Sequence, residues 1–180
     1  MDGETLRDGI FALRTRRFGT VAEVLVQRLY RLKKSQTLFH DLFDDTQEHR
    51  VEVKFSTVLK KHRAPITEAT VLQRIAEETS SQRMIAFSAW QTSTFDSNIQ
   101  QVKRPEFDIL YYGLFFSDQI AIFRIASGDI GSQIGYSDKQ HKGNIGEGQF
   151  HITNTNLQFH LDHHLAGQLS YDEFLEMLTE

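Results

Sequence analysis

The chain has 180 residues, of which 39% are hydrophobic and 24% are charged, and it carries a formal net charge of −4. This composition predicts a globular protein with one domain, residues 1–180, and a sizeable core. There is no cysteine, which excludes disulfides and thiolate metal sites and fits a reducing cytoplasm. Because there is no apolar run of about 18 residues and no hydrophobic opening segment, we expect neither a transmembrane helix nor a signal segment.

Charge is unevenly distributed along the chain. Residues 1–63 hold 13 Lys and Arg against 9 Asp and Glu, whereas residues 64–180 hold 7 against 15. Because contact with nucleic acid is local, an acidic protein can still bind DNA through a basic surface. The asymmetry alone fits ordinary surface variation equally well.

The first stretch of the chain predicts helices. Residues 1–18 mix arginines with apolar residues and are expected to be partly helical. Gly19-Thr20 predicts a break, with Thr20 as the N-cap of a helix over 21–34 that Lys33 and Lys34 close at its C-terminal end. Glu23 then lies in the first turn, where it either complements the helix dipole or serves as an auxiliary acid. One face of this helix holds the apolar residues Val21, Val24, Leu25, Leu29 and Leu32.

Residues 39–56, FHDLFDDTQEHRVEVKFS, predict a β-hairpin. Positions 38–44 and 50–56 have strand-like patterns, and the polar segment 45–49 between them predicts the turn. Strand alternation places Glu52 and Lys54 on one face, and closure of the hairpin brings Asp41 roughly opposite Glu52. Two carboxylates suit Mg²⁺, and an ammonium beside them suits the charge handling of phosphodiester hydrolysis.

The segment after the hairpin is basic and irregular. Lys60, Lys61 and Arg63 either contact phosphate or belong to a solvated loop. A helix is then expected over 67–79, capped by Thr67, with Val71, Leu72 and Ile75 on its apolar side. Residues 84–90 predict a buried strand, and the polar residues 91–106 predict a boundary at Pro105.

Residues 107–126 are almost continuously apolar around Ser117-Asp118 and predict two antiparallel strands joined by a tight turn. Their aromatic residues are expected to pack in the core or in a dimer interface. Residues 149–161 resume a strand-like alternation, so His160, His163 and His164 would point in different directions and form no zinc site. Ser170 is expected to cap a final helix over 171–179.

The order of these elements resembles the PD-(D/E)XK nuclease superfamily, and within it the type II restriction endonucleases. The resemblance covers roughly residues 18–90. It rests on the helix with Glu23, the hairpin acid, and Glu52-Val53-Lys54 in a strand with apolar neighbours. No proline precedes either candidate acid; Asp41 is preferred because it pairs near Glu52, and Asp44 stays as the alternative. The implied fold is α/β (α+β), with a central mixed β-sheet flanked by helices.

The resemblance also implies a mechanism. Asp41 and Glu52 would hold Mg²⁺ with the backbone carbonyl of Val53, Lys54 would orient or deprotonate the attacking water, and Glu23 would act in the outer shell. The implied protein is a homodimer in a bacterial cytoplasm that cuts double-stranded DNA at a specific short sequence. Three alternatives stay open: a cross-strand charge pair at a sheet edge, a structure-directed repair or junction nuclease, and a non-catalytic DNA-binding protein on a nuclease fold.

Sequence-specific contacts are expected from a segment at about 130–160. Its centre, residues 136–149, combines glycines with side chains that can read bases in the major groove. Gln91 is a weaker second candidate, and a solvated loop is the alternative. The candidate DNA-binding residues in the segment are Ser137, Lys139, Gln140, His141, Lys142, Asn144, Glu147 and Gln149.

Overall fold

A computed structural model describes residues 1–61, 65–139 and 145–180. Its α-helices are α1 (Gly3–Ala12), α2 (Thr15–Tyr30), α3 (Val71–Glu77), α4 (Ser80–Arg83), α5 (Leu157–His164) and α6 (Tyr171–Thr179). Its strands are β1 (Lys33–Lys34), β2 (Leu42–Asp44), β3 (His49–Thr57), β4 (Asp96–Val102), β5 (Ile109–Phe115), β6 (Ile120–Ala126), β7 (Ser137–Lys139), β8 (Ile145–Thr153) and β9 (Leu165–Leu169). Short 3-10 turns are η1 (Phe87–Ala89), η2 (Arg104–Glu106), η3 (Ser127–Asp129) and η4 (Ser132–Ile134).

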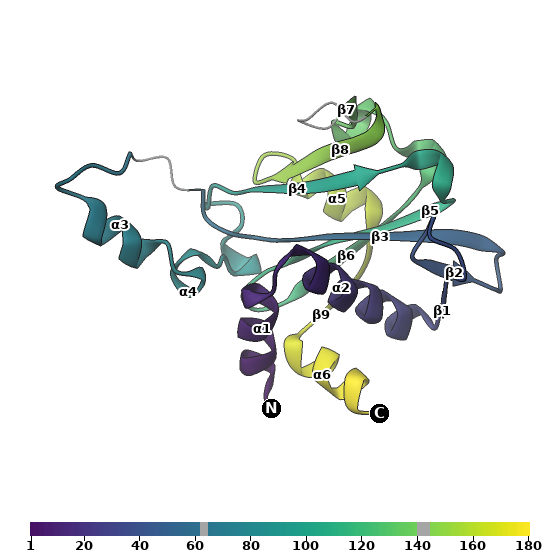
Figure 1. Ribbon diagram of the computed structural model, residues 1–180, viewed down its shortest axis with the longest axis horizontal. Helices are drawn as coiled ribbons and strands as arrows, with labels where there is room; N and C mark the ends of the chain where they lie inside the picture. The colour runs from purple at the N-terminus through teal and green to yellow at the C-terminus, as the bar shows by residue number, and fades with distance from the viewer. Residues whose placement is uncertain (62–64, 140–144) are drawn as a thin grey trace.

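The strands form two sheets, and the mixed α+β class predicted from the sequence is confirmed (Figure 1). The larger sheet has the order β1-β2-β3-β5-β6-β9, in which β3 and β5 are parallel and the other neighbours are antiparallel. The smaller sheet has the order β4-β8-β7. In Figure 1 the helices α1, α2 and α6 lie below the larger sheet, and the smaller sheet lies above it.

The strand β5 lies at the centre of the core and is buried along its whole length. Tyr111 and Phe115 face the cluster formed with α1, α2 and α6, whereas Tyr112 and Leu114 face the cluster formed with the smaller sheet and α5. A strand covered on both faces needs apolar side chains at every position, which explains the unbroken apolar run. The predicted antiparallel pair is confirmed as β5 and β6, and its aromatic residues pack in the core.

The start and end of α2 differ from the prediction. The helix begins at Thr15, so Gly19 and Thr20 lie inside it rather than breaking it. The Thr20 hydroxyl donates to the Arg16 carbonyl at 3.2 Å, a bond within the helix that removes its capping role. The helix ends where Arg31 adopts a left-handed conformation with φ of 55°. Lys33 and Lys34 therefore form β1 instead of closing the helix.

The apolar face predicted for α2 is confirmed in part, because Leu25 and Leu32 are buried, but its other buried residues differ. Ala22, Leu25 and Val26 are its buried residues, whereas Leu29 is 38% exposed. The earlier start of the helix does not change which residues share a face. The sheet lies against the stripe next to the predicted one, so Ala22 and Val26 are buried. Contact with the sheet, rather than hydropathy alone, determines which stripe is buried.

The segment between the hairpin and β5 is where the prediction fails most. Residues 84–90 do not form a strand: Met84 makes one isolated bridge with Leu59, and η1 follows. The strand β4 lies in the polar stretch 91–106, for which no strand was predicted. Buried residues such as Ser97 and Ile99 alternate there with residues that are not buried, so the strand can form from a largely polar sequence. The helix α3 starts after Thr70 rather than Thr67.

The apolar side of α3 is not covered by the described part of the chain. Leu72 is 80% exposed and Ile75 is 62% exposed, and Figure 1 shows the helix projecting from the body of the molecule.

Among the described residues, no helix is long and apolar enough to span a membrane.

In the C-terminal region the final helix agrees with the prediction, whereas the segment with the three histidines does not. The strand β8 ends at Thr153, and the three histidines lie on α5 rather than on a strand. His160 is fully buried, and its Nδ1 lies 2.8 Å from the Tyr112 hydroxyl. The final helix α6 is confirmed, and Ser170 and Glu173 form a reciprocal capping box at its start.

Candidate functional site

The hairpin places Asp41 at the point where the pairing of β2 with β3 ends. Leu42 pairs with Val51, so the preceding residue, Asp41, faces Glu52 as expected from the sequence. The Asp41 backbone N–H donates to the Val51 carbonyl at 3.1 Å. Its carboxylate accepts the Val53 N–H at 2.9 Å, so the side chain takes the place of a missing strand carbonyl. This contact fixes the Asp41 carboxylate beside β3.

Asp44 has a different position. Its carboxylate accepts backbone N–H groups from Thr46 at 2.9 Å and from Gln47 at 3.2 Å. These bonds close the hairpin turn in the way that Asp side chains commonly do. The structure therefore brings Asp41, and not Asp44, next to Glu52.

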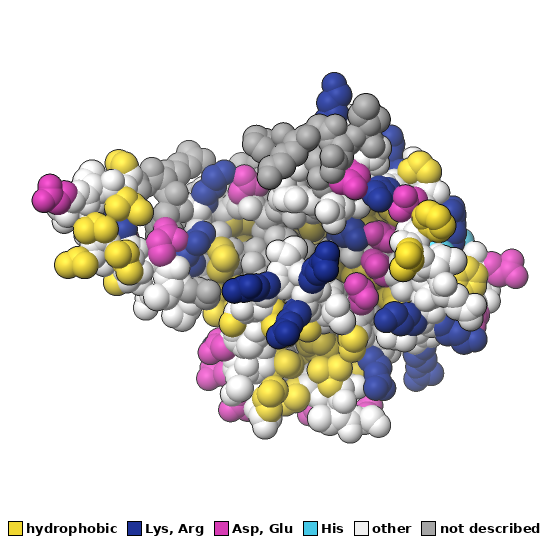
Figure 2. Space-filling view, in the orientation of Figure 1, with side chains coloured by type: hydrophobic (Ala, Val, Ile, Leu, Met, Phe, Trp, Pro, Cys, Tyr) yellow, Lys and Arg dark blue, Asp and Glu magenta, His cyan; other side chains and the backbone are white. Residues whose placement is uncertain are grey.

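Lys54 lies between the two carboxylates. Its ammonium forms an ion pair with Glu52 and lies 3.8 Å from Asp41 Oδ2. The side chains are shielded, with exposed fractions of 12% for Glu52, 23% for Lys54 and 24% for Asp41. Figure 2 shows Asp and Glu side chains gathered over β3, with Lys and Arg side chains on either side.

The charges of this group depend on its burial. Burial raises the pKa of Glu52 to about 7, and the nearby Asp41 charge acts in the same direction against the attraction of Lys54. Burial alone would lower the pKa of Lys54, but the carboxylates of Glu52, Asp41 and Glu23 outweigh it, and the Lys54 pKa is raised. The lysine is therefore held in its charged form by its neighbours.

Glu23 approaches the same group from α2. Burial raises its pKa, as does the Asp41 charge, whereas Lys54 and Lys34 lower it. Because α2 begins at Thr15, Glu23 lies beyond the first turn, and complementing the helix dipole does not explain its presence.

A cleft of about 610 Å³ joins Glu23 and Lys54 to residues that the sequence did not single out. Arg16 lines it from α2, and Asn98 and Gln100 line it from β4. These three residues were missed because the start of α2 and the existence of β4 were missed. The alternation of buried Ser97 and Ile99 within the polar stretch is the signal that could have revealed this wall.

The donor atoms around Asp41 fit a hard divalent cation. Asp41 and Glu52 supply carboxylate oxygens, and the N–H and C=O of one strand residue point to the same side, so the Val53 carbonyl also faces Asp41. Within residues 1–61, 65–139 and 145–180, no group of three or more His, Cys, Asp or Glu is placed to hold a metal. Mg²⁺ commonly uses one or two carboxylates and completes its shell with waters and phosphate oxygens, so this donor set fits it.

The predicted phosphate-contacting residues Lys60 and Lys61 follow the end of β3. The Lys61 ammonium pairs with Asp96 at 2.8 Å, and the Lys60 N–H donates to the Arg83 carbonyl at 2.8 Å. A hollow of about 380 Å³ contains Lys61 and Arg83 together with Ser56, which follows Lys54 on the same strand face. Gln91 is exposed in the turn after η1. Arg63 lies outside the described residues.

The predicted recognition segment forms β7 and β8. Ser137 and Lys139 are exposed on β7. Glu147 lies 3.7 Å from the Lys103 ammonium, and the Gln149 side-chain oxygen accepts from Asn98 at 3.1 Å. These last two side chains are therefore paired with residues in β4 or directly after it. The remaining candidates, which lie outside the described residues, are Gln140, His141, Lys142 and Asn144.

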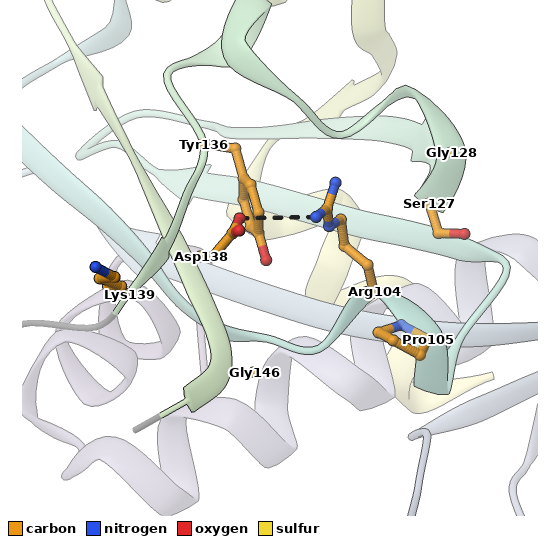
Figure 3. Close-up of a pocket in the computed structure, with 8 residues that line it drawn as sticks. All are labelled: Arg104, Pro105, Ser127, Gly128, Tyr136, Asp138, Lys139 and Gly146. Carbon is orange, nitrogen blue, oxygen red and sulfur yellow. Dashed lines mark ion pairs between the residues drawn. The ribbon is translucent and has the colours of Figure 1, made fainter. Parts of the chain in front are cut away.

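A pocket of about 860 Å³ lies between η2, η3 and β7 (Figure 3). The Arg104 guanidinium stands over the Tyr136 ring, 4.6 Å from its centroid, and lies 3.6 Å from the Asp138 carboxylate. Gly148 permits this arrangement, since a Cβ there would lie 2.0 Å from the Tyr136 hydroxyl oxygen. Sequence reasoning included β7 in its recognition segment but missed Arg104.

Comparison with known proteins assigns no family to the chain. No family model, no curated protein and no solved structure matches it. The geometry around Asp41, Glu52 and Lys54 is therefore the basis for proposing a function.

Proposed function

We propose that this protein is a Mg²⁺-dependent endonuclease of the type II restriction kind, which hydrolyses double-stranded DNA at a specific short sequence. The observation that carries the proposal is the placement of the Lys54 ammonium against the Asp41 and Glu52 carboxylates, at the end of β2 and beside a cleft. A structural ion pair would need only one carboxylate. Two shielded carboxylates around one lysine leave an excess of negative charge that a cation would neutralise.

Each residue of the group has a chemical task in this proposal. Asp41 and Glu52 hold the metal with the Val53 carbonyl, and the contact from the Val53 N–H keeps the Asp41 carboxylate in place. Bound there, Mg²⁺ supplies a Lewis acid that polarises a phosphoryl oxygen and lowers the pKa of water. The raised pKa of Lys54 favours a charged lysine that orients the nucleophile and offsets phosphate charge over one that removes a proton. The charge of Glu23 helps to keep the lysine protonated.

The smaller sheet supplies the specificity side of the proposal. Ser137 and Lys139 are exposed on β7, and Lys139 lines the same pocket as Arg104. Lysine and arginine can read guanine in the major groove. Two copies of the chain would place one cutting site on each DNA strand, which is the reason to expect a homodimer.

The proposal is tested by digesting a phage-sized DNA with the purified protein and Mg²⁺ and sequencing the ends. We expect discrete fragments with one sequence at every end. Lys54→Ala and Glu52→Ala should each lower the cleavage rate by at least about 100-fold, because each removes a charge that acts on the transition state. Asp45→Ala is the matched control, since Asp45 is a hairpin carboxylate that pairs with Lys33 outside the group.

The other outcomes identify the alternatives. Cleavage that follows DNA shape rather than sequence would indicate a repair or junction nuclease. Binding without cleavage under any divalent metal would indicate a non-catalytic DNA-binding protein. Normal cutting by both Lys54→Ala and Glu52→Ala would remove this site from the reaction.

A further inference from the structure

The segment between β1 and β2, residues 35–41, carries two exposed apolar side chains in its middle. Leu38 is 103% exposed and Phe39 is 65% exposed, and Leu38 has the largest exposed fraction of the large hydrophobic residues in the described chain. Both lie outside the helices and strands, and no helix or strand that the structure describes covers them. Single exposed hydrophobic residues are common, but two adjacent ones at the tip of a segment form a small apolar projection.

The projection is held by hydrogen bonds rather than left loose. The Ser35 N–H donates to the Asp41 carbonyl at 3.0 Å and closes the segment at its base. The Thr37 N–H donates to the Ser35 hydroxyl at 3.0 Å, and the Phe39 N–H reaches the Thr37 hydroxyl at 3.4 Å. An ordered tip can enter a partner without a large further loss of conformational entropy.

The tip stands next to the candidate cutting site. Phe39 is two residues before Asp41, and the base of the segment bonds to Asp41 itself. Lys33 and Lys34 are exposed on the strand that leads into it, and Lys34 is close enough to Glu23 to influence its charge. On the face seen in Figure 2, hydrophobic side chains lie beside the Asp and Glu side chains over this end of the larger sheet.

We infer that Leu38 and Phe39 form a wedge that enters a base step of double-stranded DNA next to the phosphate that is cut at the Asp41 and Glu52 site. The inference rests on the proposed nuclease function and adds a positioning element to it. Leucine and phenylalanine are among the side chains that proteins insert between base pairs, and the exposed lysines beside them match the charge of the DNA backbone.

The size of the projection argues against a second copy of the chain as its partner. A stable protein interface buries roughly 800 Å² on each side. One aromatic side chain contributes roughly 150–250 Å², so a tip of one phenylalanine and one leucine falls well short of that area. The same two side chains are large enough to separate the base pairs of a single step.

The test compares two double variants in a Glu52→Gln background, which is expected to bind DNA without cutting it. Leu38→Ala/Phe39→Ala removes the wedge, and Leu72→Ala/Ile75→Ala removes an exposed apolar pair of α3 as the control. The probe is a duplex that carries the sequence cut by the native protein, with 2-aminopurine beside the cut. Thermal unfolding of both variants should match that of the parent, because all four side chains are exposed.

We expect the parent and the control to raise 2-aminopurine fluorescence by unstacking it. The wedge variant should lose this rise and bind about 10- to 100-fold more weakly, the range expected for loss of contact with a base face. In the cutting-competent protein it should also slow cleavage, whereas the control pair should not.

Several results would overturn the wedge. One is equal binding and equal fluorescence for the wedge variant and the control, with native cleavage by both, which would leave the nuclease proposal intact. Another is loss of a dimer in size-exclusion chromatography without loss of unstacking, which would make the tip a contact between copies. If the native protein neither binds nor cuts any duplex, the wedge and the proposed nuclease fall together.

Discussion

Asp41 and Asp44 lie three residues apart on one hairpin but satisfy different backbone groups. Asp44 accepts the N–H groups of the turn, a local arrangement that needs only the residues next to it. Asp41 accepts an N–H from the opposite strand at Val53 and faces Lys54. The Asp44 carboxylate therefore contributes to folding of the turn. The Asp41 carboxylate instead lies beside the shielded ammonium of Lys54.

This difference predicts that the same substitution lowers the cleavage rate at one position and not at the other. Asp41→Asn keeps an oxygen for the Val53 N–H but removes the negative charge, so cleavage should fall by at least about 100-fold with little change in stability. Asp44→Asn keeps the turn bonds and should cut within about 3-fold of the native rate, since removing an N–H partner is what costs stability there. Cleavage rates and urea unfolding of both variants measure this. Greater loss of activity in Asp44→Asn would reverse the assignment.

Elements defined by neighbouring residues were predicted better than elements defined by distant ones. The hairpin of β2 and β3 follows from a polar turn between alternating segments, and α6 follows from Ser170 and Glu173. The parallel pairing of β3 with β5 joins residues separated by more than 50 positions, and no local pattern encodes it. The strand β4 was missed because it is polar on one face and carries an irregular register near Val102.

The junction of β3 and β5 depends on a glycine. A Cβ on Gly113 would lie 2.2 Å from the Phe55 ring and 2.7 Å from the Ala121 carbonyl oxygen. Phe55 follows Lys54 directly, so the fit at Gly113 sets the position of the strand that carries the candidate site. Gly9 in α1 is the opposite case, because nothing lies within 4 Å of a Cβ there.

We therefore expect Gly113→Ala to lower the free energy of unfolding by about 1–3 kcal/mol, since the backbone carbonyl of Ala121 cannot move away without breaking the sheet. The displaced Phe55 should also reduce cleavage. Gly9→Ala should raise stability by up to about 1 kcal/mol through helix propensity and leave cleavage unchanged. Urea unfolding and DNA digestion check both. A Gly113→Ala protein as stable as Gly9→Ala would show that the strands are not this tightly packed.

At the scale of the whole molecule, the candidate site depends on packing between the two sheets. Glu52, Lys54 and Ser56 lie on the β3 face opposite Val51 and Val53, which pack against the helices. The cleft is completed by Arg16 from one layer and by Asn98 and Gln100 from the other. The sequence could identify the carboxylates and the lysine because they share one hairpin. It could not identify the remaining wall, which exists only once the layers are packed.

His160 is buried where these layers meet. Its ring packs against Phe150 of β8 and Phe123 of β6 and lies 2.8 Å from the Tyr112 hydroxyl of β5. Burial lowers the pKa of His160 to about 4, and the neighbouring His164 acts in the same direction. The smaller sheet, the larger sheet and α5 thus meet at an uncharged imidazole.

The lowered pKa predicts acid sensitivity of the whole fold. Between pH 6.5 and 4 the unfolded chain binds a proton at this position and the folded chain does not, so stability present above pH 6.5 is lost as the pH falls. The full effect is up to about 3 kcal/mol, from 1.36 kcal/mol for each pH unit. In a Glu52→Gln background, which removes the opposite pH dependence caused by the raised pKa of Glu52, His160→Gln should remove most of this loss of stability, with the rest due to His164, whereas His163→Gln on the exposed side of α5 should keep it. Urea unfolding of the three proteins at pH 7 and pH 5 measures the difference, and an unchanged pH dependence in His160→Gln would place the acid-sensitive contact elsewhere in the molecule.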